Sequence, residues 1–360
     1  MARPSHMVVD LAALISNYQW ACQLAPQAQT MAVIKANAYG HGAFACAQAL
    51  QTYAPAFAVA YIEEAIALRE GGIKTPILLL EGTFTADEVA LAAAQDFWLM
   101  VVDPVQVDAI LHAPVTKPLK VWLKVDTGMH RVGLNPAHVH TYHQQLLASP
   151  KVFAGIVFAT HFASADETGN NFTQLQMQRF MATIKDSKVP VSLANSAAIM
   201  AWPEAHGDWN RAGFMLYGHS PLDKKHVASE GLQPVMQLWS GIIALRQVEV
   251  GESVGYGQQW RAQRPSTIAT VAVGYGDGYP RNAASGTPVL VNGQRASLVG
   301  RVSMDMISID VTDLDSTQVG DRVCLWGQGL DINEVAHHAG TIGYELMTRV
   351  TQRLPIRYTT

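Results

Sequence analysis

Side chains that could do chemistry follow several short apolar runs, at the positions where strands would end. Lys35 directly follows the run Met31–Ile34, in a stretch with few other charges. Burial disfavours the ammonium form of a lysine and lowers its pKa, so Lys35 is a candidate nucleophilic amine. Considered alone, a lysine at this place is more often one whose stem packs on apolar neighbours while its amine reaches water.

Polar and charged residues also follow later apolar runs. They are Lys124 to Arg131, Thr160-His161, Asn195-Ser196 and the segment Asn210-Arg211-Ala-Gly213-Phe214. In a (β/α)₈ barrel the strand ends meet on one face, and the loops after strands 7 and 8 commonly bind phosphate. Ser196 and Gly213 fall after the predicted strands 7 and 8. The pattern favours pyridoxal phosphate bound to Lys35 through a Schiff base, and it equally allows an aldolase for a sugar phosphate.

The first two thirds of the chain alternate between apolar runs and helical patterns, which predicts an α/β fold. Eight runs have strand length: Met31–Ile34, Ala56–Ala60, Pro76–Leu80, Phe97–Val102, Leu119–Val125, Val152–Thr160, Val191–Ala194 and Gly213–Tyr217. Thr85 to Glu88 predicts a capping box, and Met177, Phe180, Met181 and Ile184 predict one apolar helix face. Eight repeats favour a TIM-like (β/α)₈ barrel over an open doubly wound sheet, whose glycine-rich turn is absent.

After Leu232 the pattern changes to short strands with few helices between them. These runs are Ile242–Val248, Thr267–Val273, Pro288–Val291, Met306–Val311 and Arg322–Leu325. Asn292-Gly293 is a hairpin signal. We therefore predict a barrel domain over residues 1–232 and a mainly-β domain over residues 233–360, to which His6–Val9 could add a strand.

The composition excludes several classes of protein. Hydrophobic residues make up 49% of the 360 residues, charged residues 15%, and the net charge is −4. We therefore expect a cytoplasmic protein that binds neither nucleic acid nor membrane. The three cysteines form no metal motif. His138, His140 and His143 do not share one helix face, so we expect no metal.

Several motifs, in their order and spacing, resemble those of alanine racemases, which are fold-type-III pyridoxal-phosphate enzymes. The resemblance covers essentially the whole chain. The motifs are Val33-Ile-Lys-Ala-Asn-Ala-Tyr39-Gly-His-Gly, Leu123-Lys-Val-Asp-Thr-Gly-Met-His-Arg131, Asn195-Ser-Ala, Arg211-Ala-Gly-Phe-Met-Leu-Tyr-Gly, Val254-Gly-Tyr-Gly and Val302-Ser-Met-Asp-Met. A tyrosine in a glycine-rich loop, such as Tyr256, would otherwise be read as a core residue.

The resemblance implies a role for each matching residue. Lys35 would carry pyridoxal phosphate, with His161 against its ring and Arg211 facing its pyridine nitrogen. The phosphate would be bound by Tyr39, Ser196, Gly213, Phe214 and Tyr344. Arg131 would reach the substrate carboxylate, and Lys124 lies where several relatives carry a carbamylated lysine. Tyr256 and the Met304 backbone would come from the partner subunit of a homodimer, so that two active sites are shared between subunits.

Racemisation needs a base on each face of the substrate, because the α-proton leaves from one face and returns to the other. Lys35 and Tyr256 are the expected pair, and the product D-alanine would supply peptidoglycan. Three alternatives stay open: a racemase that also accepts serine or lysine, a decarboxylase of the same fold group, and a non-catalytic pyridoxal-phosphate carrier. The second domain, with Tyr256 and Met304, argues against a carrier.

Overall fold

The computed structural model describes residues 3–185 and 188–360, and it divides into two compact units. The barrel unit consists of residues 15–216 and 220–232. The β unit consists of residues 3–14, 217–219 and 233–360. Each unit is described by itself.

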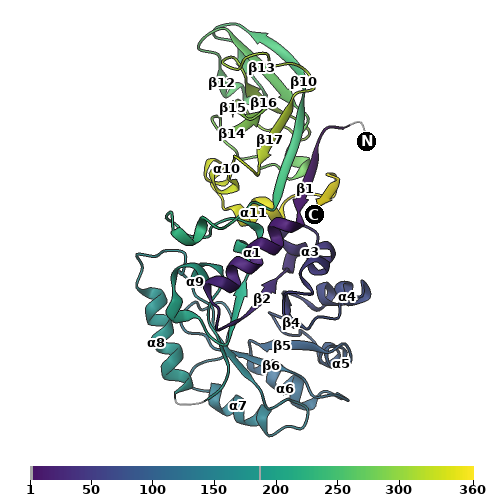
Figure 1. The fold of residues 1–360 in the computed structure, drawn as a ribbon, viewed down its shortest axis with the longest axis vertical. Helices are drawn as coiled ribbons and strands as arrows, with labels where there is room; N and C mark the ends of the chain where they lie inside the picture. Colours follow the sequence, from purple (N-terminus) through teal and green to yellow (C-terminus); the bar gives the residue numbers. More distant parts are fainter. Residues whose placement is uncertain (1–2, 186–187) are drawn as a thin grey trace. The chain divides into compact units, whose positions relative to one another are not determined.

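The barrel unit is built on eight parallel strands with helices around them (Figure 1). The strands are β2 (Gln29–Val33), β3 (Phe57–Val59), β4 (Ile77–Leu79), β5 (Phe97–Val101), β6 (Val121–Lys124), β7 (Val157–Ala159), β8 (Val191–Ser192) and β9 (Trp209–Ala212). They pair in the order β8-β7-β6-β5-β4-β3-β2-β9. The backbone N–H of Arg211 donates to Ala194 O at 3.0 Å, which joins β9 to the residues that follow β8. The predicted TIM-like barrel is confirmed.

Helices connect these strands in the way the sequence patterns indicate. They are α1 (Leu11–Leu24), α2 (Lys35–Tyr39), α3 (Ala43–Leu50), α4 (Ile62–Glu70), α5 (Ala86–Ala94), α6 (Pro104–His112), α7 (Val139–Leu147), α8 (Phe172–Ile184) and α9 (Ser196–Ala201). Thr85 caps α5, since its side chain accepts the Glu88 N–H. Glu88 in turn accepts the Phe84 N–H at 2.7 Å, so the predicted capping box is present with its partner shifted by one residue.

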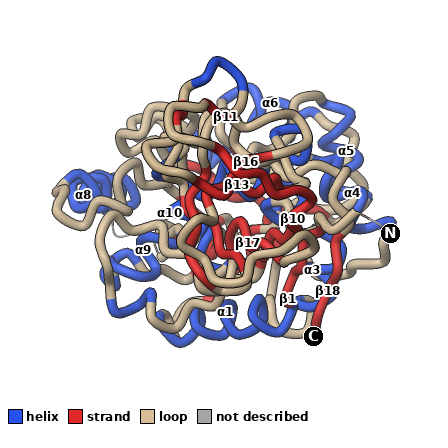
Figure 2. Tube along the Cα trace, turned by 90° about the horizontal axis from the view of Figure 1, so that it is seen from above, coloured by secondary structure: helices blue, strands red, loops and turns tan. Residues whose placement is uncertain are grey.

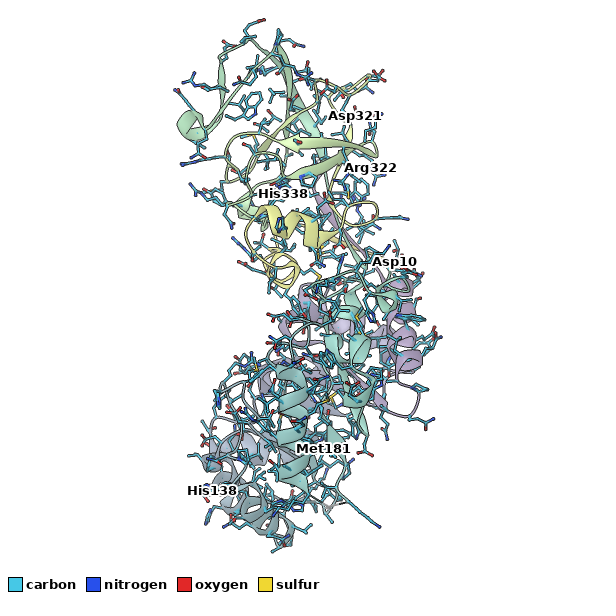
Figure 3. The ribbon with its side chains drawn as sticks, turned by 90° about the vertical axis from the view of Figure 1, so that its left-hand side faces the viewer. Asp10, His138, Met181, Asp321, Arg322 and His338 are labelled. Carbon is cyan, nitrogen blue, oxygen red and sulfur yellow. The ribbon has the colours of Figure 1, made fainter. Side chains whose placement is uncertain are left out.

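Two details of the predicted barrel were wrong. The eighth strand is Trp209–Ala212, whereas the apolar run expected to form it contains a buried 3₁₀ turn, Phe214–Tyr217. The real strand contains a buried arginine, so it does not read as apolar. On α8, Met181 (labelled in Figure 3) is 55% exposed, and the polar Gln176 is buried instead.

The β unit contains an eight-stranded sheet. Its strands are β1 (His6–Asp10), β10 (Met236–Val248), β13 (Ser266–Val271), β14 (Pro288–Val291), β15 (Gln294–Leu298), β16 (Ile307–Asp310), β17 (Arg322–Trp326) and β18 (Ile356–Thr359). The long strand β10 pairs with both β13 and β17, which closes six strands into a ring (Figure 2). β1 pairs with β10 and β18. The predicted mainly-β C-terminal domain is confirmed.

Smaller elements complete the β unit. They are the strands β11 (Ser253–Val254) and β12 (Trp260–Arg261) and the helices α10 (Ile332–His338) and α11 (Gly343–Thr348). The hairpin between β14 and β15 turns at Asn292 and Gly293, whose φ angles are 48° and 85°. Positive φ at both positions is what a tight two-residue hairpin needs, so the Asn-Gly prediction is confirmed.

Candidate active site

Lys35 lies at the carboxyl end of the first barrel strand, immediately before a left-handed turn. The four residues from Ala36 to Tyr39 all have φ between 51° and 54°. Because these are not glycines, such a conformation costs roughly 1–2 kcal/mol per residue. Backbone strain of this size persists only where the surrounding structure enforces it, and it is concentrated at functional sites. The turn fixes the direction in which the chain leaves Lys35.

Tyr39 ends this turn and brings its hydroxyl to the loops that follow the last two barrel strands. The side chain is 9% exposed, and burial raises the pKa of its phenol to about 12, so Tyr39 stays protonated as a hydrogen-bond donor. A Cβ added at Gly213 would lie 2.9 Å from Tyr39 Oη. Glycine at this position therefore lets the backbone after β9 approach the tyrosine hydroxyl.

Ser196 completes the same corner of the barrel. Its hydroxyl accepts the N–H of Gly213 at 2.9 Å and that of Met215 at 3.3 Å. Tyr39, Ser196, Gly213 and its neighbour Phe214 thus lie at one place, as predicted from the positions of strands seven and eight. Hydroxyl and backbone N–H donors around a close glycine suit a phosphate group.

A cluster of positive charge lies at the same edge of the barrel. Lys124, the last residue of β6, is 8% exposed, and burial lowers the pKa of its amine to about 8. The charges of Arg211, Arg131 and Lys35 lower that pKa further, and Glu81 is the acid that raises it. Since these charges act on one amine, the four predicted cationic residues converge. One carboxylate does not neutralise them.

His161 follows β7 and faces the same charges. Burial, together with Arg211, Lys124 and the other cations of the cluster, lowers the pKa of its imidazole well below the usual value. His161 is therefore neutral at physiological pH. Its Nδ1 lies 3.5 Å from Nη2 of Arg211, which fits Nδ1 as the acceptor and Nε2 as the protonated nitrogen.

Arg211 lies inside the barrel with 5% of its surface exposed. Its Nη1 donates to the carbonyl oxygen and the hydroxyl of Ser192 at 3.0 and 2.5 Å, and its Nη2 donates to Thr160 O at 2.7 Å. Burial lowers the pKa of the guanidinium to about 10, so it remains charged. Among the described residues Nε–H has no acceptor, which leaves one directed donor for a bound group.

The loop that carries Arg131 is organised by one carboxylate. Asp126 Oδ1 accepts the N–H groups of Gly128 and His130 at 2.9 and 3.1 Å, and Oδ2 pairs with His130 Nδ1 at 2.9 Å. Burial opposes ionisation of Asp126, but these hydrogen bonds outweigh it and lower the pKa of the carboxyl. Arg131 itself is exposed and therefore accessible to a substrate.

Gln176, which the sequence analysis did not single out, joins this loop to His161 together with Thr127 and Thr160. Thr127 Oγ1 lies 2.8 Å from Thr160 Oγ1. Gln176 Nε2 donates to Thr127 Oγ1 at 3.1 Å and to His161 O at 3.0 Å. A polar residue on the buried face of a helix needs such partners. Glutamine is common in helices, so the sequence carried no signal for this role of Gln176.

In the β unit, Tyr256 lies on a loop between two glycines. Gly255 and Gly257 have φ of 77° and 71°, which explains the Gly-Tyr-Gly motif. The loop packs on the segment that leads to Met304, since a Cβ on Gly300 would lie 2.7 Å from Val254 O. Tyr256 is 71% exposed and Met304 53% exposed. Two large side chains of the predicted site are therefore presented at the surface of this unit.

The Met304 loop is held by an ionic network around one buried carboxylate. Gly276 N–H donates to Met304 O at 2.8 Å, and the neighbouring Asp277 is fully buried. Asp277 accepts two hydrogen bonds from Arg3, at 2.9 and 2.5 Å, and pairs with Arg353 at 3.5 Å. Arg353 also donates to Asp305 at 2.7 Å, beside Met304. A buried carboxylate needs this compensation.

Tyr344, the remaining predicted phosphate ligand, lies in α11 of the β unit. In the part of the chain that is described, no group of three or more His, Cys, Asp or Glu side chains could hold a metal ion. Of the three histidines considered, His143 packs edge-on against Phe158 at 5.0 Å between ring centroids. Over residues 3–185 and 188–360, every helix is too short or too polar to cross a bilayer.

Family models match both parts of the chain. The alanine racemase N-terminal domain matches residues 9–221, and the alanine racemase C-terminal domain matches residues 235–358. The chain belongs to the alanine racemase family. This confirms the resemblance drawn from the sequence motifs.

Similar alanine racemases extend over the full length. The chain is 51% identical to the alanine racemase of Chromohalobacter salexigens, with 99% of this chain and 98% of that protein covered. It is 50% identical to the catabolic alanine racemase of Pseudomonas putida, with 99% of each covered. The crystal structure of the biosynthetic alanine racemase from Pseudomonas aeruginosa superimposes with a TM-score of 0.96 at 49% identity, covering 99% of this chain and all of that one.

One solved relative carries the cofactor that the sequence predicts. The alanine racemase of Bartonella henselae, described with covalently bound pyridoxal phosphate, is 29% identical and superimposes with a TM-score of 0.90. Both chains are covered over their full length.

The burial of Lys124 predicts a specific pH dependence of stability. An unfolded chain holds the Lys124 proton up to a pH of roughly 10.4, whereas the folded protein releases it near pH 8. The folded state therefore carries the cost of a buried charge below pH 8, and this cost disappears as the pH rises to about 10. We expect Lys124→Met to be more stable than the wild type at pH 7, by about 3 kcal/mol, and the difference to fall below about 1 kcal/mol near pH 10.

The measurement is the free energy of unfolding by urea, in bicarbonate-free buffer between pH 7 and 10. Lys117→Met removes an exposed lysine and is the matched control, for which we expect no pH-dependent difference. A wild-type-minus-variant difference that stays constant with pH for Lys124→Met would contradict the buried, proton-releasing amine.

Proposed function

We propose that this chain interconverts L-alanine and D-alanine with pyridoxal phosphate as cofactor, and that Lys35 and Tyr256 are its two bases. The observation that carries the proposal is the convergence of Lys35 with Lys124, Arg131 and Arg211 at one edge of the barrel. Such an excess of positive charge suits a phosphate and a substrate carboxylate. Membership of the alanine racemase family supports the same activity.

The described residues fit pyridoxal phosphate. When bound, the cofactor withdraws electrons from the substrate and so acidifies its α-C–H bond. Lys35 would hold it covalently, and the corner formed by Tyr39, Ser196 and Gly213 would bind its phosphate, with Phe214 and Tyr344 as the remaining predicted ligands. Arg211 Nε–H would point to the ring nitrogen, and the neutral His161 would lie against the ring.

Each base would serve one enantiomer. Once the substrate amine has displaced it from the cofactor, the Lys35 amine would take the α-proton of one enantiomer, and the Tyr256 phenolate would take that of the other. In each direction the group on the opposite face would return a proton. A free tyrosine phenol has a pKa of roughly 10, so a positive charge nearby must stabilise its anion. Arg131, or the pair of Arg211 and His161, would supply this stabilisation.

The second base would be the partner subunit's Tyr256, in a homodimer of chains with domains over residues 1–232 and 233–360. In the single chain Tyr256 and Met304 are both largely exposed, which leaves them accessible to another subunit. The Met304 backbone would contact the substrate carboxylate together with Arg131. The homodimer, this composite site and the cytoplasmic location stay predictions.

Lys124 would become carbamylated. The uncharged amine is the form that reacts with carbon dioxide, and a pKa of about 8 leaves part of it uncharged at neutral pH. The resulting anion would lie among Arg131, Arg211 and Lys35, where it would offset their mutual repulsion. Similar relatives include both a catabolic and a biosynthetic enzyme, and the supply of D-alanine to peptidoglycan stays a prediction.

The two-base assignment predicts that hydrogen exchange survives where racemisation fails. In Tyr256→Phe we expect the rate of D-alanine formation to fall by about 10²–10⁴-fold, which is the usual contribution of one general base. Lys35 should still exchange the α-hydrogen of one enantiomer for solvent deuterium, without inversion. The measurement is NMR of L- and D-alanine in D₂O, with chiral analysis of the product.

Tyr53→Phe removes an exposed phenol from the barrel unit and is the control, for which racemisation should stay unchanged. L-serine and L-lysine run in parallel measure the breadth of the substrate range. Loss of exchange from both enantiomers in Tyr256→Phe, or undiminished racemisation, would overturn the assignment of Tyr256 as the second base.

Arg211 predicts which side reaction the enzyme avoids. An arginine does not release its proton to the ring nitrogen, whereas a carboxylic acid at this place would hold a proton there and strengthen electron withdrawal. We expect Arg211→Glu to form several-fold more pyruvate per racemisation event than the wild type. Arg211→Gln also removes the guanidinium, but it adds no carboxylate, so it should not show the increase.

The measurement is the ratio of pyruvate to inverted alanine for the three proteins loaded with cofactor. An equal ratio in Arg211→Glu and Arg211→Gln would show that the residue opposite the ring nitrogen does not control this side reaction.

A further inference from the structure

The left-handed turn after Lys35 is stabilised by hydrogen bonds that are local in sequence. Within the turn, Ala38 N–H donates to Ile34 O at 2.9 Å, and Gly40 N–H donates to Ala36 O at 3.0 Å. Asn37 Oδ1 accepts the Ala43 N–H at 2.8 Å from the start of the next helix. These contacts are all local in sequence.

One carboxylate from another element reaches the first residue of the turn. Glu64 Oε1 accepts the N–H of Ala36, directly after Lys35, at 2.5 Å. Its other oxygen accepts the N–H groups of Ala60 and Tyr61, at 2.8 and 3.3 Å, where α4 begins. Glu64 therefore ties the chain at Lys35 to the residues that follow the neighbouring strand β3.

We infer that Glu64 is a positioning residue for Lys35. Ala36 has φ 51° and ψ 51°, a conformation that an alanine leaves unless something holds it. A charged acceptor makes a strong hydrogen bond, and this one fixes the peptide group that joins Lys35 to the turn. Since β3 pairs in register with β2, the carboxylate holds Lys35 relative to the rigid part of the barrel.

A glutamate at the third position of a helix has an ordinary explanation as well. In a capping box it accepts an N–H at the start of its own helix, and Glu64 does so through Oε2. The bond to Ala36 is the part that capping does not explain. The two roles are separable, because only the positioning role depends on the conformation of Ala36.

This inference rests on the proposed role of Lys35 in holding the cofactor. The test compares Glu64→Gln with Glu63→Gln, which removes the same charge from the same helical turn but from an exposed side chain. A glutamine has one acceptor oxygen in place of two, so its NH₂ group meets a backbone N–H at one end. We expect Glu64→Gln to lose pyridoxal phosphate at least about tenfold faster on dialysis. We also expect its kcat to fall by a larger factor than the factor by which its KM changes.

A rescue separates positioning from capping. Glycine adopts positive φ without cost, so Ala36→Gly in the Glu64→Gln background should recover part of the cofactor retention and of kcat. If Glu64 only caps α4, Ala36→Gly recovers neither. Glu64→Asp keeps the charge but shortens the side chain, so it should have an intermediate effect, and it replaces Glu64→Gln should that variant fail to fold.

The readouts are the visible absorbance of bound cofactor during dialysis, the kinetic constants, and thermal unfolding as a check on folding. Equal cofactor retention in Glu64→Gln and Glu63→Gln, or no rescue by Ala36→Gly, would overturn the inference. Failure of the proposed function gives a different result, because the wild type itself would then lose its cofactor on dialysis and form no D-alanine.

Discussion

Four cationic side chains at one edge of the barrel repel one another, and one acid, Glu81, opposes that repulsion. The parallel strands force this proximity, because Lys124 ends β6 and Arg211 lies within β9. Burial lowers the pKa of Lys124 to about 8 and that of His161 well below its usual value, and the neighbouring cations lower both further. An anionic cofactor and a carboxylate substrate, bound here as proposed, would relieve the repulsion. The folded barrel therefore holds an excess of positive charge that bound anions would neutralise.

Most of this arrangement could be predicted from sequence because parallel strands impose a simple rule. Apolar runs predicted seven of the barrel strands. The polar residues that follow these runs were predicted to lie at one edge of the barrel, because its parallel strands all end there. The eighth strand was missed because Arg211 occupies it, and a buried arginine breaks the apolar pattern by which strands are found. That residue satisfies four of its N–H groups with barrel atoms, which no local pattern reveals.

Contacts between elements far apart in sequence could not be predicted. Gln176 reaches Thr127 across 49 residues, and Glu64 reaches Ala36 across 28. Neither glutamine nor glutamate is unusual in a helix, so their types carry no signal. The left-handed turn after Lys35 was equally hidden, because alanine and tyrosine do not favour that conformation. In each case tertiary contacts override the local conformational preference of the chain. Each of these contacts lies beside residues of the predicted active site.

The central claim is that the Lys35 amine, and not the more deeply buried Lys124 amine, bonds to the cofactor. Borohydride reduction of the protein loaded with pyridoxal phosphate, followed by peptide mapping with mass spectrometry, tests it most directly. The account predicts a single pyridoxyl label on the peptide that contains Lys35, and no such label in Lys35→Ala. A label on Lys124 or on any other lysine in the wild type would contradict it.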